Sequence, residues 1–231
     1  MIFQEKLSYY AYSKQQICFW WREDDVSYDC DKLRIVLDIL LKYNISLLCG
    51  VIPKLLTQDM IVLLKNYPNA IVCQHGLFHK NNYTQDYKCE FDTVESFNQI
   101  TQGREFLQKT FQNQFIPVYI PPWNNISKQF KNTILNSGWA AVSTWNYSSD
   151  KKRPYNCDID FINWAKSESF GGEDFVINQI LQCFDRKDFN IGIVNHHRTM
   201  GIDGIKFIKK LLSEIDKYSN IVWKSPSQHF F

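Results

Sequence analysis

Short apolar runs alternate along this chain with longer segments of helical periodicity, and this alternation limits the folds that are open to it. The runs that we expect to form strands are 17–21, 47–52, 70–73, 117–120, 140–143 and 191–195. The segments that we expect to form helices are 31–43, 57–66, 93–112, 127–137, 173–184 and 202–218. Strands and helices in regular alternation are typical of βαβ units, which build parallel sheets and barrels. The sequence therefore predicts an α/β fold.

The length and composition of the chain fit one such unit. Barrels of about 231 residues commonly form a single domain, and the chain has no internal repeat and no Pro/Gly/Ser-rich linker. We expect one domain over residues 1–231. The 26 Lys and Arg residues nearly balance the 24 Asp and Glu residues, for a formal charge of +2, and they form no long basic run. Nucleic acid is therefore not an expected partner.

No segment of the sequence has the pattern of a membrane span or an export signal. The first 16 residues lack an uninterrupted apolar stretch, and no apolar run reaches the ~18 residues needed to cross a bilayer. The seven cysteines are scattered and form no Cys-x-x-Cys pair, which favours reduced thiols. We expect a cytoplasmic protein without a membrane span. The oligomeric state is not indicated by any of these patterns.

Side chains suited to catalysis stand almost wholly just after the expected strands. They are Asp24-Asp25 after the first strand, His75 and His79 after the third, Pro122-Trp123 after the fourth, and His196-His197 after the last. In parallel sheets and barrels the strand-to-helix loops converge at one edge, where ligands bind. Four segments that are distant in sequence are therefore expected at one mouth.

Two imidazoles and a carboxylate make an ordinary site for a divalent metal. His75 and His79 have a spacing that can close on one ion from a helical turn or a curled loop. Asp24 and Asp25 repel each other unless a cation is near, so one of them can ligate while the other handles protons. Each motif alone also has a structural explanation, an exposed acidic turn that caps a helix and a pair of hydrogen-bonded core histidines.

His196 and His197 close a late apolar strand. A histidine at a strand end that faces a water nucleophile or a leaving amine is well placed as a general acid. Either of the two can point inward, and the sequence does not distinguish them. A pair exposed on the surface is the structural alternative.

Six further residues are expected to contact the substrate or the developing oxyanion: Arg22, Lys88, Glu90, Pro122, Trp123 and Asn124. The Pro-Pro-Trp-Asn turn fixes an extended backbone, after which an N–H can donate to an oxyanion and the indole can form a wall of an acyl or sugar pocket. Lys88 and Glu90 close a polar loop over 80–92, and loops of this length often cover active sites. A stiff connection with a buried tryptophan, and a solvated Lys-Glu pair, are the structural alternatives.

In this order, the segments resemble the polysaccharide deacetylase family with the NodB homology fold, also described as carbohydrate esterase family 4. That family has an Asp-Asp pair at the end of its first strand, a His-x-x-x-His motif, a proline turn with an aromatic residue, and a histidine after a late strand. The matching residues span about 17 to 200: Asp24-Asp25, His75 and His79, Pro122-Trp123, and His196 and His197. The surrounding motifs further resemble a divergent branch found with O-antigen and capsule sugar loci.

The resemblance implies a distorted (β/α) barrel with fewer than eight units, a seven-stranded variant of the TIM barrel. It also implies a divalent metal, with zinc as the expected ion. The roles that it implies are metal ligation by Asp25, His75 and His79, general base catalysis by Asp24, general acid catalysis by His196 or His197, and stabilisation of the oxyanion by an N–H near Trp123.

The chain departs from the family pattern at two places. Arg22-Glu23 stands where the family has Thr-Phe, and the family's third-motif arginine, which tethers the catalytic aspartate, is replaced around Ile120-Pro121. Arg22 or Lys88 could supply the missing cation. The fourth motif, Asp-x-x-Asp-Trp, has only a loose echo in Asp158, Asp160 and Trp164.

The resemblance thus implies a metal-dependent hydrolase that removes an N-acyl group, first of all N-acetyl, from a sugar. The expected substrate is a nucleotide-linked or lipid-linked sugar, or an oligosaccharide. One alternative keeps the fold and the metal but makes the enzyme a deformylase or a cyclic-amide hydrolase. Another is a non-catalytic carbohydrate-binding barrel, which the missing arginine favours and the retained ligands oppose.

Overall fold

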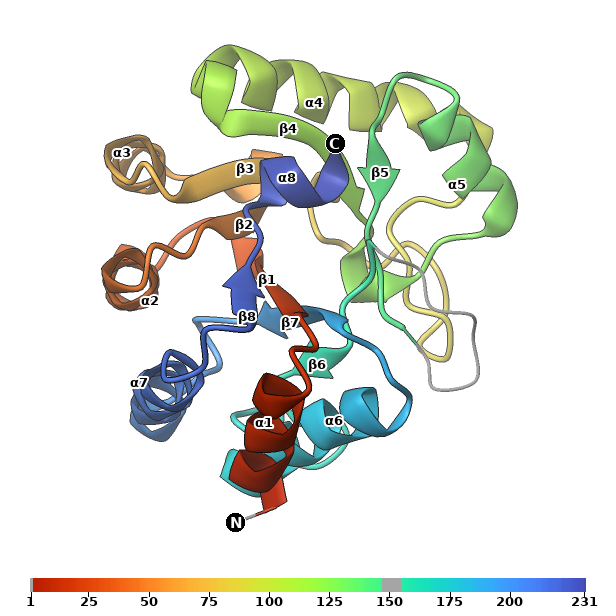
Figure 1. The fold of residues 1–231 in the computed structure, drawn as a ribbon. Coiled ribbons are helices and arrows are strands. Elements are labelled where there is room, and N and C mark those ends of the chain that lie inside the picture. Colours follow the sequence, from red (N-terminus) through yellow and green to blue (C-terminus); the bar gives the residue numbers. More distant parts are fainter. Residues whose placement is uncertain (1, 147–154) are drawn as a thin grey trace.

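The computed structural model describes residues 2–146 and 155–231. Its strands form one parallel sheet that curls into an open barrel (Figure 1). They are β1 (Ile17–Val26), β2 (Leu47–Val51), β3 (Ala70–His75), β4 (Phe115–Ile120), β5 (Ala141–Val142), β6 (Ile159–Asp160), β7 (Asn190–Asn195) and β8 (Ile221–Trp223). The order is β5-β4-β3-β2-β1-β7-β6, and β8 pairs with the start of β1. The expected distorted (β/α) barrel with fewer than eight units is confirmed.

Helices cover the outer face of the sheet, except for the C-terminal one, which packs into the barrel interior (Figure 1). They are α1 (Ile2–Tyr12), α2 (Cys30–Lys42), α3 (Gln58–Asn66), α4 (Phe97–Phe111), α5 (Lys128–Leu135), α6 (Glu173–Asp185), α7 (Ile202–Ile215) and α8 (Pro226–Phe230). Four single 3₁₀ turns connect them, η1 (Pro53–Leu55), η2 (Val94–Ser96), η3 (Gln112–Gln114) and η4 (Pro122–Asn124). No helix within the described residues has both the length and the apolarity to cross a bilayer.

All six expected strands and all six expected helices are present, but their limits differ in one place that matters for function. We expected the first strand to stop at Trp21, whereas β1 continues to Val26. The acidic pair Asp24-Asp25 therefore belongs to the strand and does not follow it. The continuous burial of residues Arg22 to Asp24 inside a sheet covered on both faces explains the error, because charged residues usually mark a strand end.

The two faces of β1 pack against different layers. Successive side chains of a strand point to opposite faces, so Phe19 and Trp21 join the large cluster between sheet and helices, while Trp20 joins the cluster inside the barrel. The C-terminal helix α8 adds Phe230 to this inner cluster, edge-on to Trp20 at 5.5 Å. This alternation places the side chains of Arg22 and Asp24 on the inner face and that of Glu23 on the outer face.

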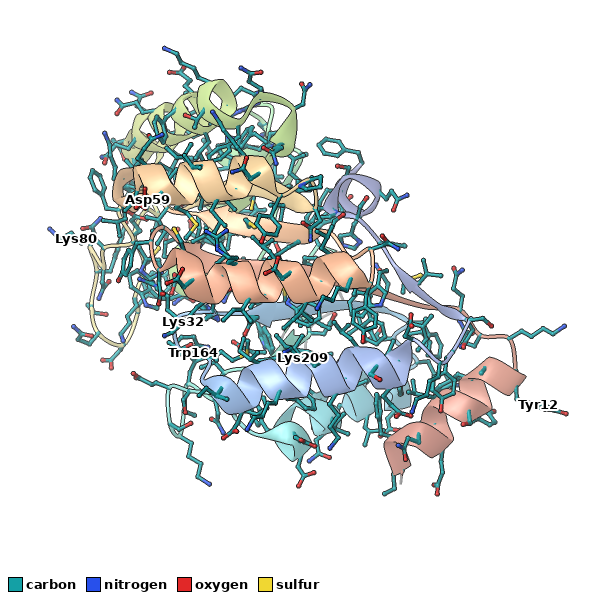
Figure 2. The ribbon with its side chains drawn as sticks, turned by 90° about the vertical axis from the view of Figure 1, so that its left-hand side faces the viewer. Tyr12, Lys32, Asp59, Lys80, Trp164 and Lys209 are labelled. Atoms are coloured by element: carbon teal, nitrogen blue, oxygen red, sulfur yellow. The ribbon has the colours of Figure 1, made fainter. Side chains whose placement is uncertain are left out.

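One end of the molecule gathers the loops that leave the strands. Figure 2 shows Lys32, Lys80 and Trp164 at this end, although they follow β1, β3 and β6, and shows Tyr12 of α1 at the opposite end. The convergence of strand-end loops that the sequence predicted is therefore present.

All seven cysteines are free thiols, as expected.

Candidate metal centre and its cavity

A bulge in β1 presents the acidic pair. In the pairing of β1 with β2, Glu23 lies opposite Cys49 and Val26 lies opposite Val51. Between these two pairs β1 has two residues and β2 has one, so β1 holds one extra residue. Asp25 is this extra residue, and its backbone is left-handed, with a φ of 62°. Bulges re-aim side chains at the edges of sheets, and this one turns two successive carboxylates toward the same end of the barrel.

Asp25, His75 and His79 converge as a possible metal site. Oδ1 of Asp25 lies 3.2 Å from Nε2 of His75 and 3.2 Å from Nε2 of His79, and the three candidate ligand atoms lie within 4.8 Å of one another. Nδ1 of His75 donates to the carbonyl oxygen of Ile120 at 3.1 Å, which leaves the lone pair of Nε2 facing the other two groups. One carboxylate and two imidazoles are a donor set that fits zinc and related divalent ions.

The three candidate ligands differ in how readily they would bind a metal. Burial lowers the pKa of His75, but the hydrogen bond with Asp25 and the charges of Asp24 and Asp25 outweigh it and raise that pKa, so a metal would compete with a proton on this ring. Burial by itself would raise the pKa of Asp25, but the hydrogen bond and the charge of His75 outweigh it and hold that pKa well below its usual range. Burial, followed by repulsion from His75, lowers the pKa of His79 to about 4. An ionised carboxylate and a neutral imidazole are the forms that bind a metal.

The loop between the two histidines is held by Glu90. Its buried carboxylate accepts hydrogen bonds from the backbone N–H groups of Leu77, at 2.9 Å, and Phe78, at 2.6 Å. Burial raises the pKa of Glu90. Gly76 passes against this carboxylate at a φ of 57°, and a Cβ there would stand 2.0 Å from Oε2 of Glu90. Glu90 was expected to contact substrate, whereas here it supports the curled loop that carries His79.

Arg22 lies against Asp24 in the barrel interior. Its Nη2 donates to Oδ2 of Asp24 at 2.9 Å and to Oδ1 of Asn124 at 2.9 Å, and its Nη1 donates to Oγ of Ser143 at 2.9 Å. Because Arg22 is 0% exposed, the expected role as a substrate contact is wrong. Of the two cations considered for tethering Asp24, the structure thus places Arg22 on it. The other oxygen, Oδ1 of Asp24, has no hydrogen-bond partner among the described residues.

His196 occupies the wall opposite the metal site. Its Nδ1 lies 4.0 Å from Oδ1 of Asp160, whose other oxygen accepts a hydrogen bond from the Trp164 indole at 2.8 Å. The rings of Trp164 and His196 meet edge-on at 4.8 Å. Asp160 and Trp164, only a loose echo of a motif in the sequence, are therefore neighbours of His196. His197 is fully buried and points to the outer face of the sheet.

Both walls border one cavity of about 730 Å³. Its lining residues are Asp24, Asp25, His75, His79, Lys88, Trp123, Asn124, Trp145, Asp160, Ile162, Asn163, Trp164, Ala165, Glu168, Phe175, Gln179 and His196. Of the expected substrate contacts, Lys88, Trp123 and Asn124 lie here, and Trp123 also packs on His79 with ring centroids 4.6 Å apart. Arg22, Glu90 and Pro122 are buried behind the wall, as is His197.

Two charged residues of this region escaped the sequence reasoning. Glu23 is fully buried behind the site, and Arg198 places its Nη2 3.2 Å from Oδ2 of Asp25. The signal that could have found Glu23 is the run of four charged residues, 22–25, that directly continues an apolar strand, since charged residues are almost never buried without partners. No comparable signal marks Arg198.

No protein-family model matches this chain, and no curated protein sequence is detectably similar to it. Among solved structures, it is similar to a peptidoglycan N-acetylglucosamine deacetylase, with 16% identity, a TM-score of 0.62, and coverage of 93% of this chain and 89% of that chain. A family 4 carbohydrate esterase from Bacillus anthracis is 14% identical, with a TM-score of 0.59 over 94% of this chain and 83% of that chain.

A CE4 family pseudoenzyme from the same organism is also similar, with 12% identity, a TM-score of 0.63, and coverage of 94% of this chain and 66% of that chain. At these identities the likeness shows a shared fold. It extends over nearly the whole of this chain.

Proposed function

We propose that this chain is a metal-dependent carbohydrate N-deacetylase. The observation that carries the proposal is the convergence, in one cavity, of an Asp-His-His group, an aspartate with one unpartnered oxygen, and a histidine on the opposite wall. These are the parts that hydrolysis of an amide needs: a metal, a base for the water and an acid for the amine. The similarity in fold to a deacetylase and a carbohydrate esterase supports the same activity.

Asp25, His75 and His79 would hold the metal, for which zinc is the expected ion. A bound divalent metal would polarise the amide carbonyl and make its water more acidic. The backbone N–H near Trp123 would donate to the oxyanion, since η4 places this residue beside His79 at the edge of the cavity.

Asp24 would act as the general base. Its Oδ2 is held by Arg22, so the carboxylate cannot rotate freely, and its unpartnered Oδ1 is left to accept a proton from the attacking water. The buried guanidinium also compensates the charge of this carboxylate beside Asp25. Asp24 thereby has the orientation and the charge that a base requires.

His196 would act as the general acid that returns a proton to the leaving nitrogen. It borders the cavity, whereas His197 does not, and this favours His196 over His197 as the acid. Asp160 lies beside the His196 ring, with its Oδ1 4.0 Å from Nδ1, where it can help to orient the imidazole.

The substrate proposed is an N-acetylated sugar, either nucleotide-linked, lipid-linked or part of an oligosaccharide. Trp123, Trp145 and Trp164 offer aromatic faces to a sugar ring, and the amides of Asn124 and Asn163 offer hydrogen bonds to hydroxyl groups. The cytoplasmic location, the single domain and the assignment to the branch found with O-antigen and capsule sugar loci stay predictions.

The test is acetate release from N-acetylated sugars by protein that is stripped of metal and then reloaded with zinc. We expect turnover to be lost and regained with the metal, and to be absent in His75→Ala. His229→Gln is the matched control, because His229 lies in α8 and packs on Trp20, outside the cavity. Release of formate in place of acetate would indicate the deformylase alternative. Metal-independent turnover, or tight sugar binding without turnover in reloaded protein, would refute the proposal.

A further inference from the structure

A buried cluster on the outer face of the sheet lies directly behind His196. Glu23 of β1 stands opposite Asn195 of β7 in the strand register, and both side chains are fully buried. Oε2 of Glu23 accepts a hydrogen bond from Nδ2 of Asn195 at 2.8 Å. Oε1 accepts from Nδ1 of His197 at 2.9 Å and also from the backbone N–H of His197. One carboxylate thus binds the residue before His196 and the residue after it.

The alternation of a strand explains why this cluster matters for the cavity. Val194 belongs to the inner cluster and Asn195 points outward, so His196 returns to the inner side and His197 to the outer side. Glu23 therefore accepts two hydrogen bonds from side chains, those of Asn195 and His197, and one from the backbone N–H of His197, and so anchors the residues on both sides of His196 without touching its ring. A side chain whose two neighbours in the chain are anchored has few orientations left.

The same cluster reaches the loop that follows β1. Nε2 of His197 donates to the carbonyl oxygen of Tyr28 at 3.3 Å, since a carbonyl can only accept. The guanidinium of Arg198 lies over the Tyr28 ring at 4.7 Å, and its Nη2 forms an ion pair with Oδ2 of Asp25 at 3.2 Å. The contacts of residues 195–198 thus connect the wall that carries His196 with the wall that carries the metal site.

We propose that Glu23 and His197 are positioning residues for proton transfer by His196. They form a latch behind the sheet that fixes residues 195–197, so that the imidazole of His196 faces the leaving nitrogen. This inference rests on the proposed function. It also gives different tasks to two of the four charged residues of β1, because Arg22 holds the base from the inner face and Glu23 positions the acid from the outer face.

The experiment compares two substrates that differ in their need for an acid. An N-acetylated amino sugar loses an amine, which must be protonated as it leaves, whereas 4-nitrophenyl acetate loses a phenolate, which leaves without a proton. In metal-loaded Glu23→Gln we expect kcat for the amide to fall by about 10²-fold, the scale of general acid catalysis, with KM little changed. Hydrolysis of the ester is expected to stay within about twofold of wild type.

His196→Ala supplies the reference pattern. It is expected to lose the amide reaction and keep the ester reaction, and addition of Glu23→Gln to it is expected to cause no further loss, because the two residues act on one step. His197→Asn is a second variant in case Glu23→Gln does not fold, since an asparagine keeps a donor near Glu23 but loses the bond to Tyr28. We expect it to show the same selectivity with a smaller loss.

Asp158→Asn is the matched control. Asp158 is also a buried carboxylate that accepts a backbone N–H of β7, that of Gly192 at 2.9 Å, but toward the other end of the strand. It is expected to lower thermal stability without separating the amide from the ester. Equal losses on both substrates in Glu23→Gln, or no loss on either, would overturn the latch while leaving the deacetylase proposal standing.

A readout independent of turnover completes the test. In protein labelled at its histidine rings, the NMR resonances of His196 are expected to shift or broaden in Glu23→Gln and to stay in place in Asp158→Asn. Unchanged His196 resonances would overturn the latch even if activity fell. A wild-type protein that loads zinc but hydrolyses neither substrate would instead overturn the proposed function, and with it the role given to His196.

Discussion

The two walls of the cavity are built by different means. On the metal wall the functional groups contact one another directly, at 3.2 Å, and four residues have left-handed backbones, Asp25, His79, Trp123 and Asn124. On the opposite wall, His196 stands 4.0 Å from its carboxylate neighbour, its two neighbours in the chain are held from behind, and one cavity residue, Glu168, has a left-handed backbone. The ligands of one metal ion must lie at set distances from it, whereas a proton donor meets its partner only when substrate binds. Backbone strain is therefore greater on the wall where several groups must meet at one point.

Strand β1 belongs to both walls. Its inner face carries Arg22 and Asp24, and its outer face carries Glu23, which reaches the opposite wall through β7. Variants along this strand and at its neighbours can therefore affect one wall and spare the other.

The largest effect is expected from Asp24→Asn. The variant keeps the shape of the side chain and should keep full metal content, because Asp24 is not one of the three converging ligands. Loss of the base should lower kcat by about 10²- to 10⁴-fold. Metal analysis and acetate release measured on the same sample test this, and loss of metal in Asp24→Asn would mean that the two carboxylates share one task.

Arg22→Met should come next, mainly in stability. It removes the cation from a buried pair and leaves Asp24 without compensation, which is expected to lower the free energy of unfolding by about 3–5 kcal/mol. Denaturant unfolding measures this. The double variant Arg22→Met/Asp24→Leu should recover much of the stability but no activity. A stability of Arg22→Met equal to that of wild type would contradict the pairing.

A smaller loss, about 1–3 kcal/mol, is expected from Gly76→Ala, because a left-handed residue would also press a Cβ against Glu90. Its zinc affinity should fall as well, since the loop carries His79. Gly138→Ala is the control: its φ is 79°, but the nearest atom to a Cβ there is 3.7 Å away. Unchanged zinc affinity in Gly76→Ala would show that the metal wall tolerates more movement than its strain suggests.

The smallest effect is expected from Trp164→Phe, on the opposite wall. The variant keeps the aromatic face toward His196 but removes the hydrogen bond to Asp160, which is worth about 0.5–1.5 kcal/mol or more. We expect a loss in kcat of about 2- to 10-fold, measured with the amide substrate, and no change in metal content. A loss in kcat as large as that of Asp24→Asn would show that the opposite wall needs its groups positioned as precisely as the metal wall does.

Much of the fold was predictable because both faces of the sheet are buried. Parallel strands covered on both sides are continuous apolar runs, and helices with one buried face are periodic, so both leave a signal in the sequence. The strand β6 has only two residues and leaves no such signal in the sequence. Asp160 therefore matched a family motif only loosely, and its position opposite Val194 of β7 is visible only in the structure. The short helix α8 was missed for the same reason.

The sequence predicted which residue types form the site but not where their side chains point. Few residue types bind metals or move protons, which is why four residues stand out, His75, His79, Asp24 and Asp25. The order of their motifs along the chain is what resembles the polysaccharide deacetylase family. The same order could not distinguish His196 from His197. Because β7 is apolar on both faces, its sequence does not show which of two successive side chains points into the barrel.

The sequence was enough to predict the βαβ alternation, the edge at which the functional residues gather, and the residues suited to bind a metal. The folded chain was needed to show that β1 runs on through Asp25, that Arg22 holds Asp24, and that Glu23 lies behind His196. Alternation and residue type are local properties of the chain, whereas the surroundings of a buried charge come from distant residues: even Arg22, which pairs with Asp24 two positions away, is held in place by groups more than a hundred positions away. Arg22 and Ser143, and Glu23 and His197, meet only once the sheet has closed.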